Sequence, residues 1–467
     1  MKPLQINEIV KAVEAIDYTS DQRLMTVESV SFDSRESKPN SLFVPLQGQT
    51  DGHQYIDKAI ANGATAAFWS LPMAQAPKDI AIIQVEDTLV AMQKLAQYYL
   101  EVIQPKVIGI TGSAGKTTTK DMTAAVLSAN FNVHKTEGNY NNEIGLPYTI
   151  LAMPENTEIL VLEMGMSGPG EIRFLSQLAK PDIAIITMIG ESHIEYLGSR
   201  KNIAKAKLEI CDGLAPDGTL IYPGNEPLLT QFMPKDLSAR QLTVGLSEEQ
   251  NVYAVDMDLD QQHVRFTTNL SPTFEMDIPV TGAYNVQNAL YALATAYTLG
   301  LSIEQAHDKL AHFQLTANRM EWLPGYNESH LLNDAYNANP SAMRAVVDNL
   351  AQLPIEDHAK RVLVLGDMLE LGPNSPQWHA SIAEVISSDA YQTIFLYGKE
   401  MKALYEALLA KGFDTTNVQH FVDDREALIK AVKSVLAPDD LVLIKASNGT
   451  VLLEVVEALK VQASSEE

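Results

Sequence analysis

The chain has 467 residues, 46% of them hydrophobic and 20% charged, so it is long enough for about three globular domains with buried cores. Its 34 basic and 59 acidic residues give a formal net charge of −25, which argues against general binding to nucleic acid or anionic membranes, because both need a basic surface. Small anionic substrates are not excluded, since a few local cations or one helix N-terminus can bind them.

The cysteine content and the N-terminal residues favour a cytoplasmic location. Cys211 is the only cysteine, so no intrachain disulfide can form and a reducing compartment fits best. The first residues, MKPLQINEIVKAVEAIDY, carry charges throughout and lack the apolar core of a signal peptide. No stretch approaches the roughly 18 apolar residues of a membrane helix. We therefore expect a cytoplasmic protein without membrane insertion.

Residues 1–85 predict a small first domain of mixed α and β structure. The runs SLFVPL, TAAFW and IAIIQV are typical of short strands, and IDKAIANGA is typical of a helix. The next segment, LVAMQKLAQYYLEVI, predicts a helix that leads to Pro105.

Residues 86–317 predict a second, larger α/β domain. From Val107 the apolar runs VIGIT, ILVLE and DIAIIT alternate with helical segments, and a β-rich stretch follows from about 219 to 280. The apolar segment NVQNALYALATAYTLG predicts the helix that closes this domain. Such alternation predicts a parallel sheet covered by helices.

Residues 318–467 predict a third domain, because the alternation starts again. HLLND, RVLVLGD, TIFLYG and LVLIKAS are strand-like, and PSAMRAVVDNL is helical. We therefore expect an α/β protein of three domains, with functional sites at the domain junctions and at the carboxyl ends of strands.

The clearest motif is GITGSAGKTTTK at residues 109–120, a glycine-rich turn between a predicted strand and a predicted helix. Gly112 and Gly115 would allow backbone N–H groups to approach a phosphate, Lys116 would supply charge, and the Thr117 hydroxyl suits Mg²⁺. Ile110 stands where the strict GxxxxGK[ST] spacing requires glycine. A chance Gly-Lys turn is the alternative interpretation.

Three further residues are candidates for the same chemistry. Glu163 ends the apolar run ILVLE, where a carboxylate could bind Mg²⁺ or cap the next turn. His193 follows the strand-like DIAIIT and is either structural or functional. Lys207 lies beside the apolar stripe of NIAKAKLEICDGL, either as a lysine that reaches solvent or as an unpaired buried ammonium.

The order of motifs along the chain resembles the Mur ligases of peptidoglycan synthesis. TGSAGKTTTK, TEGNYNNEIGLP, LEMG, ESHIEYLGS, AKAKLEI, GAYNVQNAL, NRMEW and NDAYNANPSAM occur in that order. The N-terminal DSRESKPNSLFVPLQGQTDGHQYIDKAIANGA is similar to the family's nucleotide-sugar domain, and GDMLELG and DAYNANP are similar to the branch that adds D-alanyl-D-alanine. The resemblance covers essentially the whole chain.

The resemblance implies a fold and an activity. The fold would be a nucleotide-sugar domain (1–85), a central P-loop ATPase-like parallel-sheet domain (86–317) and a C-terminal Rossmann-like domain (318–467). The activity would be ATP- and Mg²⁺-dependent ligation of D-alanyl-D-alanine to UDP-N-acetylmuramoyl tripeptide. An acyl phosphate and a tetrahedral intermediate would form, and ADP and phosphate would be released. The resemblance also implies a monomer.

The resemblance assigns roles to the catalytic candidates. Lys116 and the loop backbone would hold phosphates, Thr117 and Glu163 would bind one Mg²⁺, and His193 would help to bind a second. Lys207 matches the family's carbamylated lysine, an N-carboxylysine that can face metal. The residues implied to bind ATP are Gly112, Ser113, Ala114, Gly115, Lys116, Thr117, Thr118, Asn285, Asn288, Arg319, Asp334 and Tyr336.

The resemblance also implies contacts to the UDP-linked substrate and to the incoming amine. These residues are Ser34, Arg35, Asp51, His53, Thr136, Asn139, Asn141, Asn142 and Asn337. Ordinary turns are the alternative explanation for DSR, DGH and the Asn-rich stretch, and helix capping or interhelical bonding is the alternative for Asn285 and Asn288. Tyr336 and Asn337 would face either the nucleotide or the incoming amine.

Two positions depart from the family pattern. Asn318 precedes Arg319 where glycine is expected, which a left-handed asparagine would tolerate. KASNGT replaces a more basic KGSR-like sequence, so no C-terminal arginine is assigned to D-alanyl-D-alanine.

Two other classes of protein were weighed against this resemblance. A folylpolyglutamate-type ligase would be expected to begin close to its phosphate loop, whereas about a hundred residues precede the loop here. A GTPase switch would normally contain NKxD, and the sequence has no Asn-Lys pair.

Overall fold

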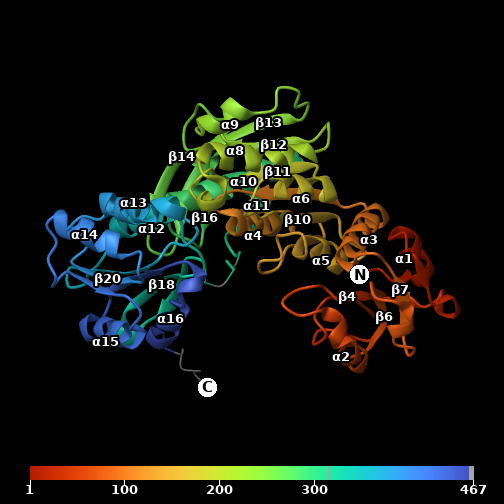
Figure 1. Ribbon diagram of the computed structural model, residues 1–467. Helices are drawn as coiled ribbons and strands as arrows, with labels where there is room; N and C mark the ends of the chain where they lie inside the picture. The colour runs from red at the N-terminus through yellow and green to blue at the C-terminus, as the bar shows by residue number, and fades with distance from the viewer. Residues whose placement is uncertain (314, 317, 462–467) are drawn as a thin grey trace, which may run out of the picture.

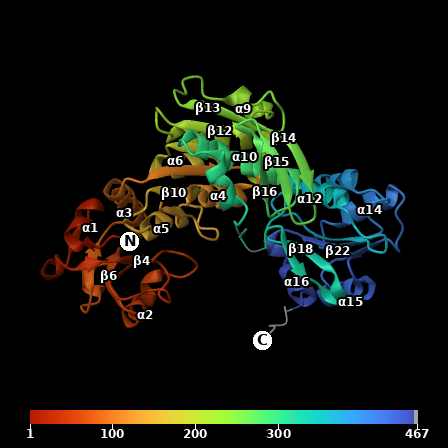
Figure 2. The same ribbon diagram turned by 180° about the vertical axis from the view of Figure 1, so that it is seen from behind.

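The computed structural model describes all residues except 314, 317 and 462–467. The chain forms three lobes, and the N-terminal and C-terminal lobes lie on opposite sides of the central one (Figures 1 and 2). The three-domain α/β prediction is confirmed as a fold class. The predicted boundaries stay predictions, and residue 317 at the second boundary lies outside the described residues.

The N-terminal lobe is built on a five-stranded sheet of order β2-β7-β6-β5-β4. Its strands are β2 (Asp17–Tyr18), β4 (Ser29–Ser31), β5 (Ser41–Phe43), β6 (Ala64–Trp69) and β7 (Ala81–Gln84). Only β2 is antiparallel to its neighbour. A two-stranded ladder joins β1 (Leu4–Gln5) to β3 (Thr26–Val27), and the helices are α1 (Ile6–Ala12) and α2 (Ile56–Ala61).

The central lobe contains a nine-stranded sheet of order β16-β15-β14-β13-β12-β11-β8-β10-β9. The strands are β8 (Lys106–Thr111), β9 (Val133–Lys135), β10 (Ile159–Glu163), β11 (Ile183–Ile186), β12 (Thr219–Pro223), β13 (Arg240–Gly245), β14 (Val252–Leu259), β15 (Val264–Thr268) and β16 (Ser271–Ile278). They run parallel from β9 to β14, as predicted, and β15 and β16 add an antiparallel edge.

Helices cover both faces of the central sheet (Figures 1 and 2). They are α3 (Thr88–Ile103), α4 (Lys116–Leu127), α5 (Gly145–Ala152), α6 (Glu171–Ala179), α7 (Ile194–Leu197), α8 (Arg200–Leu208), α9 (Pro227–Phe232), α10 (Ala283–Thr298) and α11 (Ile303–Leu310). Strand side chains alternate between faces. Leu160 and Leu162 of β10 therefore enter one core, while Ile159 and Val161 enter the other.

The first of these cores continues into the N-terminal lobe. It unites Leu4 and Phe68 of that lobe with Leu160 of the central sheet, through Tyr99 on α3. The buried Tyr99 hydroxyl donates to the Met153 carbonyl oxygen at 2.9 Å and accepts the Lys2 backbone N–H at 2.6 Å. The N-terminal and central lobes are therefore packed as one apolar body.

The C-terminal lobe has a six-stranded sheet of order β17-β18-β22-β19-β20-β21 with a core on each face. Its strands are β17 (Glu321–Pro324), β18 (His330–Asp334), β19 (Arg361–Gly366), β20 (Thr393–Tyr397), β21 (Val418–Phe421) and β22 (Leu441–Lys445). The helices are α12 (Pro340–Gln352), α13 (Ser375–Ala380), α14 (Lys402–Ala410), α15 (Arg425–Val435) and α16 (Leu453–Leu459).

The helix that contains Lys207 ends earlier than its apolar spacing predicts. The stripe runs to Leu214, but α8 stops at Leu208 and a tighter 3₁₀ turn covers Glu209–Asp212. At Gly213 an added Cβ would lie 2.1 Å from the Ser176 carbonyl oxygen, so the backbone of α6 packs directly against this turn. Because of this close approach, a 3₁₀ turn stands where the apolar spacing predicts the last turn of the α-helix.

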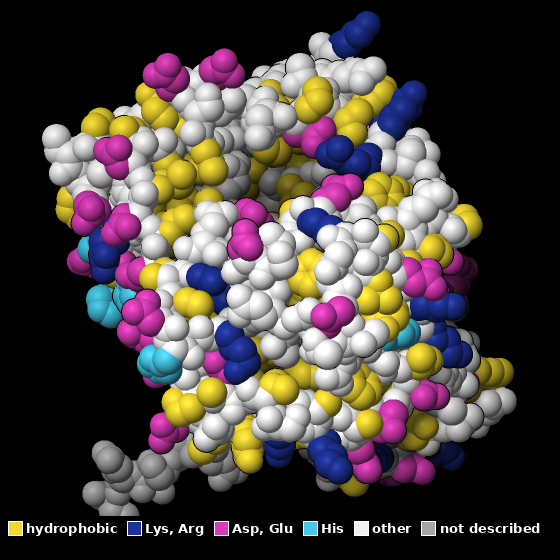
Figure 3. Space-filling model, turned by 90° about the vertical axis from the view of Figure 1, so that its left-hand side faces the viewer, with side chains coloured by type: hydrophobic (Ala, Val, Ile, Leu, Met, Phe, Trp, Pro, Cys, Tyr) yellow, Lys and Arg dark blue, Asp and Glu magenta, His cyan; other side chains and the backbone are white. Residues whose placement is uncertain are grey.

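The surface agrees with the charge analysis. On the face in Figure 3, Lys and Arg side chains are dispersed among Asp and Glu side chains. Within the described part of the chain, no helix has the length and apolar character required to cross a bilayer.

Candidate active site

The glycine-rich loop connects β8 to α4 and lies at the carboxyl edge of the central sheet. Gly115, the residue before α4, is left-handed with φ 79°, and an added Cβ would lie 2.6 Å from Asn288 Oδ1. At Gly112, with φ 154°, an added Cβ would lie 1.9 Å from Thr187 Oγ1. Both positions therefore require glycine, and the loop presents the N-terminus of α4, which favours bound anions.

Lys116 turns back over this loop. Its Nζ donates to the Gly112 carbonyl oxygen at 3.0 Å, and it has no carboxylate within ion-pair distance among the described residues. Burial lowers the pKa of Lys116; Glu163 opposes the shift and Arg319 adds to it. A buried cation that bonds only to a peptide carbonyl is well suited to an arriving anion.

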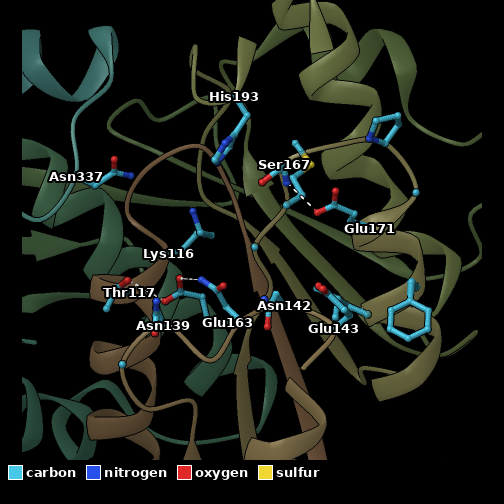
Figure 4. A pocket seen from close by; sticks show the side chains of 18 of the residues that line it. Lys116, Thr117, Asn139, Asn142, Glu143, Glu163, Ser167, Glu171, His193 and Asn337 are labelled. Carbon is cyan, nitrogen blue, oxygen red and sulfur yellow. Dashed lines mark hydrogen bonds between the residues drawn. The ribbon is translucent and has the colours of Figure 1, made fainter. Parts of the chain in front are cut away.

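Glu163, the last residue of β10, is held from three sides. The Thr117 hydroxyl donates to its Oε2 and the Asn141 amide to its Oε1, each at 2.8 Å. Its own backbone N–H donates to Thr136 Oγ1 at 3.0 Å. The carboxylate is 2% exposed, and Figure 4 shows it beside Thr117 and below Lys116. Thr136 is fully buried, and its hydroxyl oxygen supports Glu163 by accepting this backbone N–H.

His193 lies in the loop after β11, immediately before α7. Its Nδ1 is 2.5 Å from Glu370 Oε2 of the C-terminal lobe. Burial lowers the pKa of His193, the Glu370 carboxylate opposes this shift, and the charges of Lys116 and Lys207 add to it.

Lys207 is buried on α8 with 1% of its surface exposed. Among the described residues, its ammonium forms no hydrogen bond and no salt bridge. Burial and the nearby Lys116 lower the pKa of Lys207 well below its ordinary value, although Glu163 and Glu171 oppose the shift. Of the two alternatives for Lys207, the buried one is therefore found, not the lysine that reaches solvent.

A cavity of about 830 Å³ brings many of the predicted residues together. Those in its wall are Lys116, Thr117, Asn139, Asn141, Asn142, Glu163, His193, Arg319, Tyr336 and Asn337. Figure 4 shows Lys116, Thr117, Glu163 and His193 of the central lobe on one side of this cavity and Asn337 of the C-terminal lobe on the other. Lys207 is not part of this lining and lies behind it.

A second cavity, of about 240 Å³, adjoins the first at the junction of the central and C-terminal lobes. Its predicted lining residues are Ser113, Ala114, Gly115, Lys116, Thr117, Thr118, Asn285, Asn288, Arg319, Asp334 and Asn337. Lys116, Thr117, Arg319 and Asn337 line both cavities. These residues therefore form a shared wall between a large and a small compartment.

Asn285 and Asn288 face the smaller cavity and also bond to each other. Asn288 Nδ2 donates to Asn285 Oδ1 at 3.0 Å, and Asn285 Nδ2 donates to the Thr281 carbonyl oxygen at 2.7 Å. Thr119 of α4 donates to Asn288 Oδ1 at 3.2 Å. Interhelical bonding is thus present, and both side chains still line the cavity.

Arg319 extends from the C-terminal lobe over the Tyr336 ring, with 4.1 Å from the guanidinium carbon to the ring centre. Its Nε is buried and has no hydrogen-bond partner among the described residues. Asn318 has φ 62°, so the left-handed asparagine expected before Arg319 is confirmed. Lys445, the basic residue of KASNGT, donates to Asp334 Oδ2 at 2.5 Å and to the Asn337 carbonyl oxygen at 3.0 Å.

Besides the buried Thr136, four predicted substrate residues line neither of these two cavities. Asp51 and His53 line a separate cavity of about 220 Å³ at the edge of the N-terminal lobe, with His53 Nδ1 2.6 Å from Asp51 Oδ1. Ser34 is buried, and the side chain of Arg35 is exposed and pairs with Asp33 at 2.5 Å. Neither Ser34 nor Arg35 lines the cavities described above.

Sequence reasoning missed a buried charged network behind the site. Lys120, fully buried on α4, donates to the Thr136 carbonyl oxygen at 2.8 Å and lies 3.3 Å from Asp121. Asp121 also binds Lys135 at 2.6 Å and accepts the Thr316 hydroxyl at 2.7 Å. Two adjacent charges on a helix inside the central domain are the signal that could have revealed it.

The metal-binding capacity of the protein alone is limited. Within the described residues, no group of three or more His, Cys, Asp and Glu side chains is placed to hold a metal ion. Thr117 and Glu163 offer adjacent oxygen atoms, the ligand type that Mg²⁺ prefers, and Mg²⁺ in such sites usually takes phosphate oxygens as further ligands.

The fold and this geometry define a three-domain α/β enzyme built around a phosphate-binding loop. Three family descriptions match the chain: "Mur ligase family, catalytic domain" at residues 26–103, "Mur ligase middle domain" at 110–296, and "Mur ligase, glutamate ligase domain" at 318–448. The chain belongs to the Mur ligase family, as its motifs predicted.

Individual relatives show which members of the Mur ligase family this chain is similar to. The chain is 44% identical to the UDP-N-acetylmuramoyl-tripeptide–D-alanyl-D-alanine ligase of Bacillus subtilis, over 93% of each chain, and 32% identical to that of Escherichia coli, over 93% of this chain and 94% of the other. A crystal structure of MurF from Acinetobacter baumannii matches with TM-score 0.86, 29% identity and 98% coverage of both chains. MurF ligase from Thermotoga maritima in complex with ADP matches with TM-score 0.80 and 27% identity, over 92% of this chain and 97% of the other.

The buried Asp121 should make stability depend on pH. Burial alone would raise the pKa of Asp121, but Lys120, Lys135 and the Thr316 hydrogen bond outweigh it and lower the pKa. A carboxyl group whose pKa is lower in the folded state stabilises the protein at pH values above its unfolded-state pKa, which is about 3.9 for aspartate. This stabilisation is lost as the pH falls through the folded-state pKa. Asp121→Asn should therefore reduce the free energy of unfolding by about 3 kcal/mol at pH 7, with a smaller difference below about pH 4.

Thermal unfolding of both proteins across pH 3–7 measures this difference. Asp217→Asn, which removes an exposed carboxylate from the same domain, is the matched control and should show little effect. If the difference in stability between Asp121→Asn and the parent does not become smaller at low pH, the inference that Asp121 is ionised in the folded protein is wrong.

Proposed function

We propose that this chain joins D-alanyl-D-alanine to a UDP-N-acetylmuramoyl tripeptide and converts ATP to ADP and phosphate. The reaction would serve peptidoglycan precursor synthesis in the cytoplasm, with the enzyme acting as a monomer and without nucleic acid. Support comes from family membership and from the names of the relatives that match over 93% of the chain.

The wall shared by the two cavities is the observation that carries the proposal. The smaller cavity contains the phosphate loop and Asn285 and Asn288, and suits ATP; the larger one suits the muramoyl tripeptide. Lys116, Thr117 and Arg319 stand where the two compartments meet. A γ-phosphate at this wall would face a carboxylate in the larger cavity, which is the geometry that phosphoryl transfer requires.

The chemistry begins with an inert carboxylate. Its oxygen takes the γ-phosphoryl group of ATP, so a C–O–P anhydride forms as the β–γ bond breaks and ADP leaves. The neutral amine of D-alanyl-D-alanine then attacks the acyl carbon, and the tetrahedral intermediate expels phosphate while the amine loses its proton. Lys116, Arg319 and the N-terminus of α4 oppose the negative charge that develops at each stage.

The residues fit bound Mg²⁺. Thr117 and Glu163 would hold one ion, His193 would contribute to a second, and phosphate oxygens would complete each set of ligands. Mg²⁺ neutralises phosphate charge during transfer. Asn141 keeps the Glu163 carboxylate in place.

Lys207 fits carbamylation. Its lowered pKa favours the neutral amine, which can attack CO₂ to form a carbamate and release a proton. The product replaces a buried neutral amine with an anion that the positive charge of Lys116 stabilises.

We assign the remaining substrate contacts from the position of each residue in the structure. Asn139, Asn141 and Asn142 would bind the sugar-peptide portion in the larger cavity, and Thr136 would support the adjacent Glu163. Asp51 and His53 would bind the UDP portion in the cavity of the N-terminal lobe, with Ser34 and Arg35 nearby on that lobe. Asp334 would contact the ribose, and Tyr336 and Asn337 the nucleotide or the incoming amine.

Phosphate release tests the activity. The protein is incubated with ATP, Mg²⁺ and D-alanyl-D-alanine, with and without UDP-N-acetylmuramoyl tripeptides that end in meso-diaminopimelate or L-lysine. We expect release only when one of the tripeptides and the dipeptide are both present. Absence of ATP consumption with the full set would refute the proposal, and turnover with folate and glutamate instead would favour the folylpolyglutamate-type alternative.

Lys116→Ala should lower the rate of phosphate release at least about a hundredfold, because the lysine opposes charge that develops during transfer. The melting temperature should stay close to that of the parent. Lys235→Ala, an exposed lysine of the same domain, is the control and should retain full activity. Near-parental turnover of Lys116→Ala would show that this loop does not act in phosphoryl transfer.

Lys207→Ala should be largely inactive and should recover part of its activity with formate or acetate, which can replace the carbamate. In the parent protein, ¹³C-bicarbonate should give a carbamate carbon signal by NMR that Lys207→Ala lacks. Lys205→Ala on the same helix is exposed and should behave as the parent. Full activity of Lys207→Ala without added acid would exclude the carbamate.

A further inference from the structure

The loop that carries His193 is held by the C-terminal lobe at two separate places. The first is the start of α12, where the Ser341 backbone N–H and hydroxyl donate to Glu191 Oε2 at 3.1 and 2.6 Å. Asn339 Nδ2 donates to Ser192 Oγ at 2.9 Å. Glu191, Ser192 and Asn339 are buried, so these bonds form a closed interface on one side of His193.

The second place is the turn that follows β19, in the sequence GDMLELG. The Glu195 backbone N–H donates to the Glu370 carbonyl oxygen at 3.2 Å. At Gly372, with φ 63°, an added Cβ would lie 3.3 Å from Glu195 Cα, so the two loops are in close contact. Glu370 Oε2 lies 2.5 Å from His193 Nδ1.

Both partners of this last contact have uncommon backbone conformations. His193 has φ 60° and Glu370 has φ 61°, in the left-handed region that non-glycine residues rarely occupy. Strained residues of this kind persist where the surrounding structure fixes them, often at functional sites. Here they direct a carboxylate of one domain to an imidazole of the other.

We propose that Glu370 is a positioning residue that orients the His193 ring, so that docking of the C-terminal lobe completes a ligand of the second Mg²⁺ site. The inference rests on the role given to His193 under Proposed function. A carboxylate that accepts a hydrogen bond from Nδ1–H keeps the proton on Nδ1 and leaves the Nε2 lone pair free for metal, an arrangement common behind metal-binding histidines. His193 projects into the larger cavity, above Lys116 (Figure 4).

In this structure the His193 ring is close to the orientation in which Nδ1–H donates to Glu370, but the two groups are not aligned. Although the two atoms are 2.5 Å apart, His193 Nδ1 has no aligned hydrogen bond among the described residues. A small rotation of the imidazole would align the N–H with the carboxylate, and such contacts often tighten when substrates bind. The same lobe supplies Arg319, so its docking would bring the guanidinium and the histidine into place together.

The ring itself provides the decisive test. In ¹⁵N-histidine protein with a non-hydrolysable ATP analogue but without metal, we expect the parent to show the Nδ1–H tautomer of His193, identified by comparison with His193→Asn. Glu370→Ala should lose this preference, and Glu370→Gln should retain most of it because its amide oxygen can still accept the Nδ1–H hydrogen bond. An unchanged His193 signal in Glu370→Ala would overturn the inference, whatever the enzyme does.

A metal titration then tests the consequence. With Mn²⁺ and a non-hydrolysable ATP analogue, the second Mn²⁺ should bind at least about tenfold more weakly to Glu370→Ala than to the parent, while the first is unaffected. Equal affinity for the second ion would overturn the coupling to metal. A parent that binds only one Mn²⁺ would instead refute the role of His193 under Proposed function, and the ring signal would still decide whether Glu370 positions it.

Glu328→Gln is the matched control. Glu328 is also a left-handed glutamate of the C-terminal lobe, with φ 60°, and its exposed side chain makes no contact of this kind among the described residues. It should match the parent in both measurements. Glu370 is 43% exposed at its side chain, so its variants should fold as the parent does.

Discussion

Positive charge that is buried without a matching carboxylate is the constraint on which this site depends. In the part of the chain that the structure describes, Lys116 bonds only to a peptide carbonyl and the Arg319 Nε is unpaired. Burial of unpaired cations destabilises a folded chain unless anions join them. The free protein therefore holds a site that nucleotide phosphates, a substrate carboxylate and a lysine carbamate would stabilise, and this links binding of each anion to binding of the others.

The order of strands explains why these groups meet. β8 lies between β10 and β11, and all three run parallel, so the phosphate loop, Glu163 and the loop that carries His193 leave the same edge of the sheet. α10 packs against α4 and brings Asn288 to the loop glycine. The C-terminal lobe then closes one side with Arg319 and Asn337. A parallel sheet thus assembles, from distant segments, a site that no single segment could form.

Local patterns in the sequence predicted the parallel sheets and the phosphate loop, because apolar runs and glycine spacing act within a few residues. The order of motifs along the whole chain predicted the family and, from the family pattern, the left-handed Asn318. The helical stripe left open whether Lys207 is buried or reaches solvent. The contacts of Glu370 with His193 and of Lys120 with Thr136 join residues far apart in sequence, so no spacing could reveal them. Thr136 was assigned to substrate, yet its hydroxyl holds Glu163, since burial depends on packing that the sequence does not state. The edge strands β17 and β21 were also missed, because such short segments have little periodicity.

The two outer lobes differ in how freely they can move. The apolar core that runs from Leu4 through Tyr99 to Leu160 joins the N-terminal lobe to the central sheet, so any rotation there would expose hydrocarbon to water. The C-terminal lobe has two cores. Ile194 and Tyr284 of the central lobe pack against one of them, and the other contacts with the centre are polar bonds and the cavity walls. Rigid-body swinging during the catalytic cycle would then belong to the C-terminal lobe, and a compound wedged beneath that lobe would hold the enzyme ajar without competing for the sugar nucleotide.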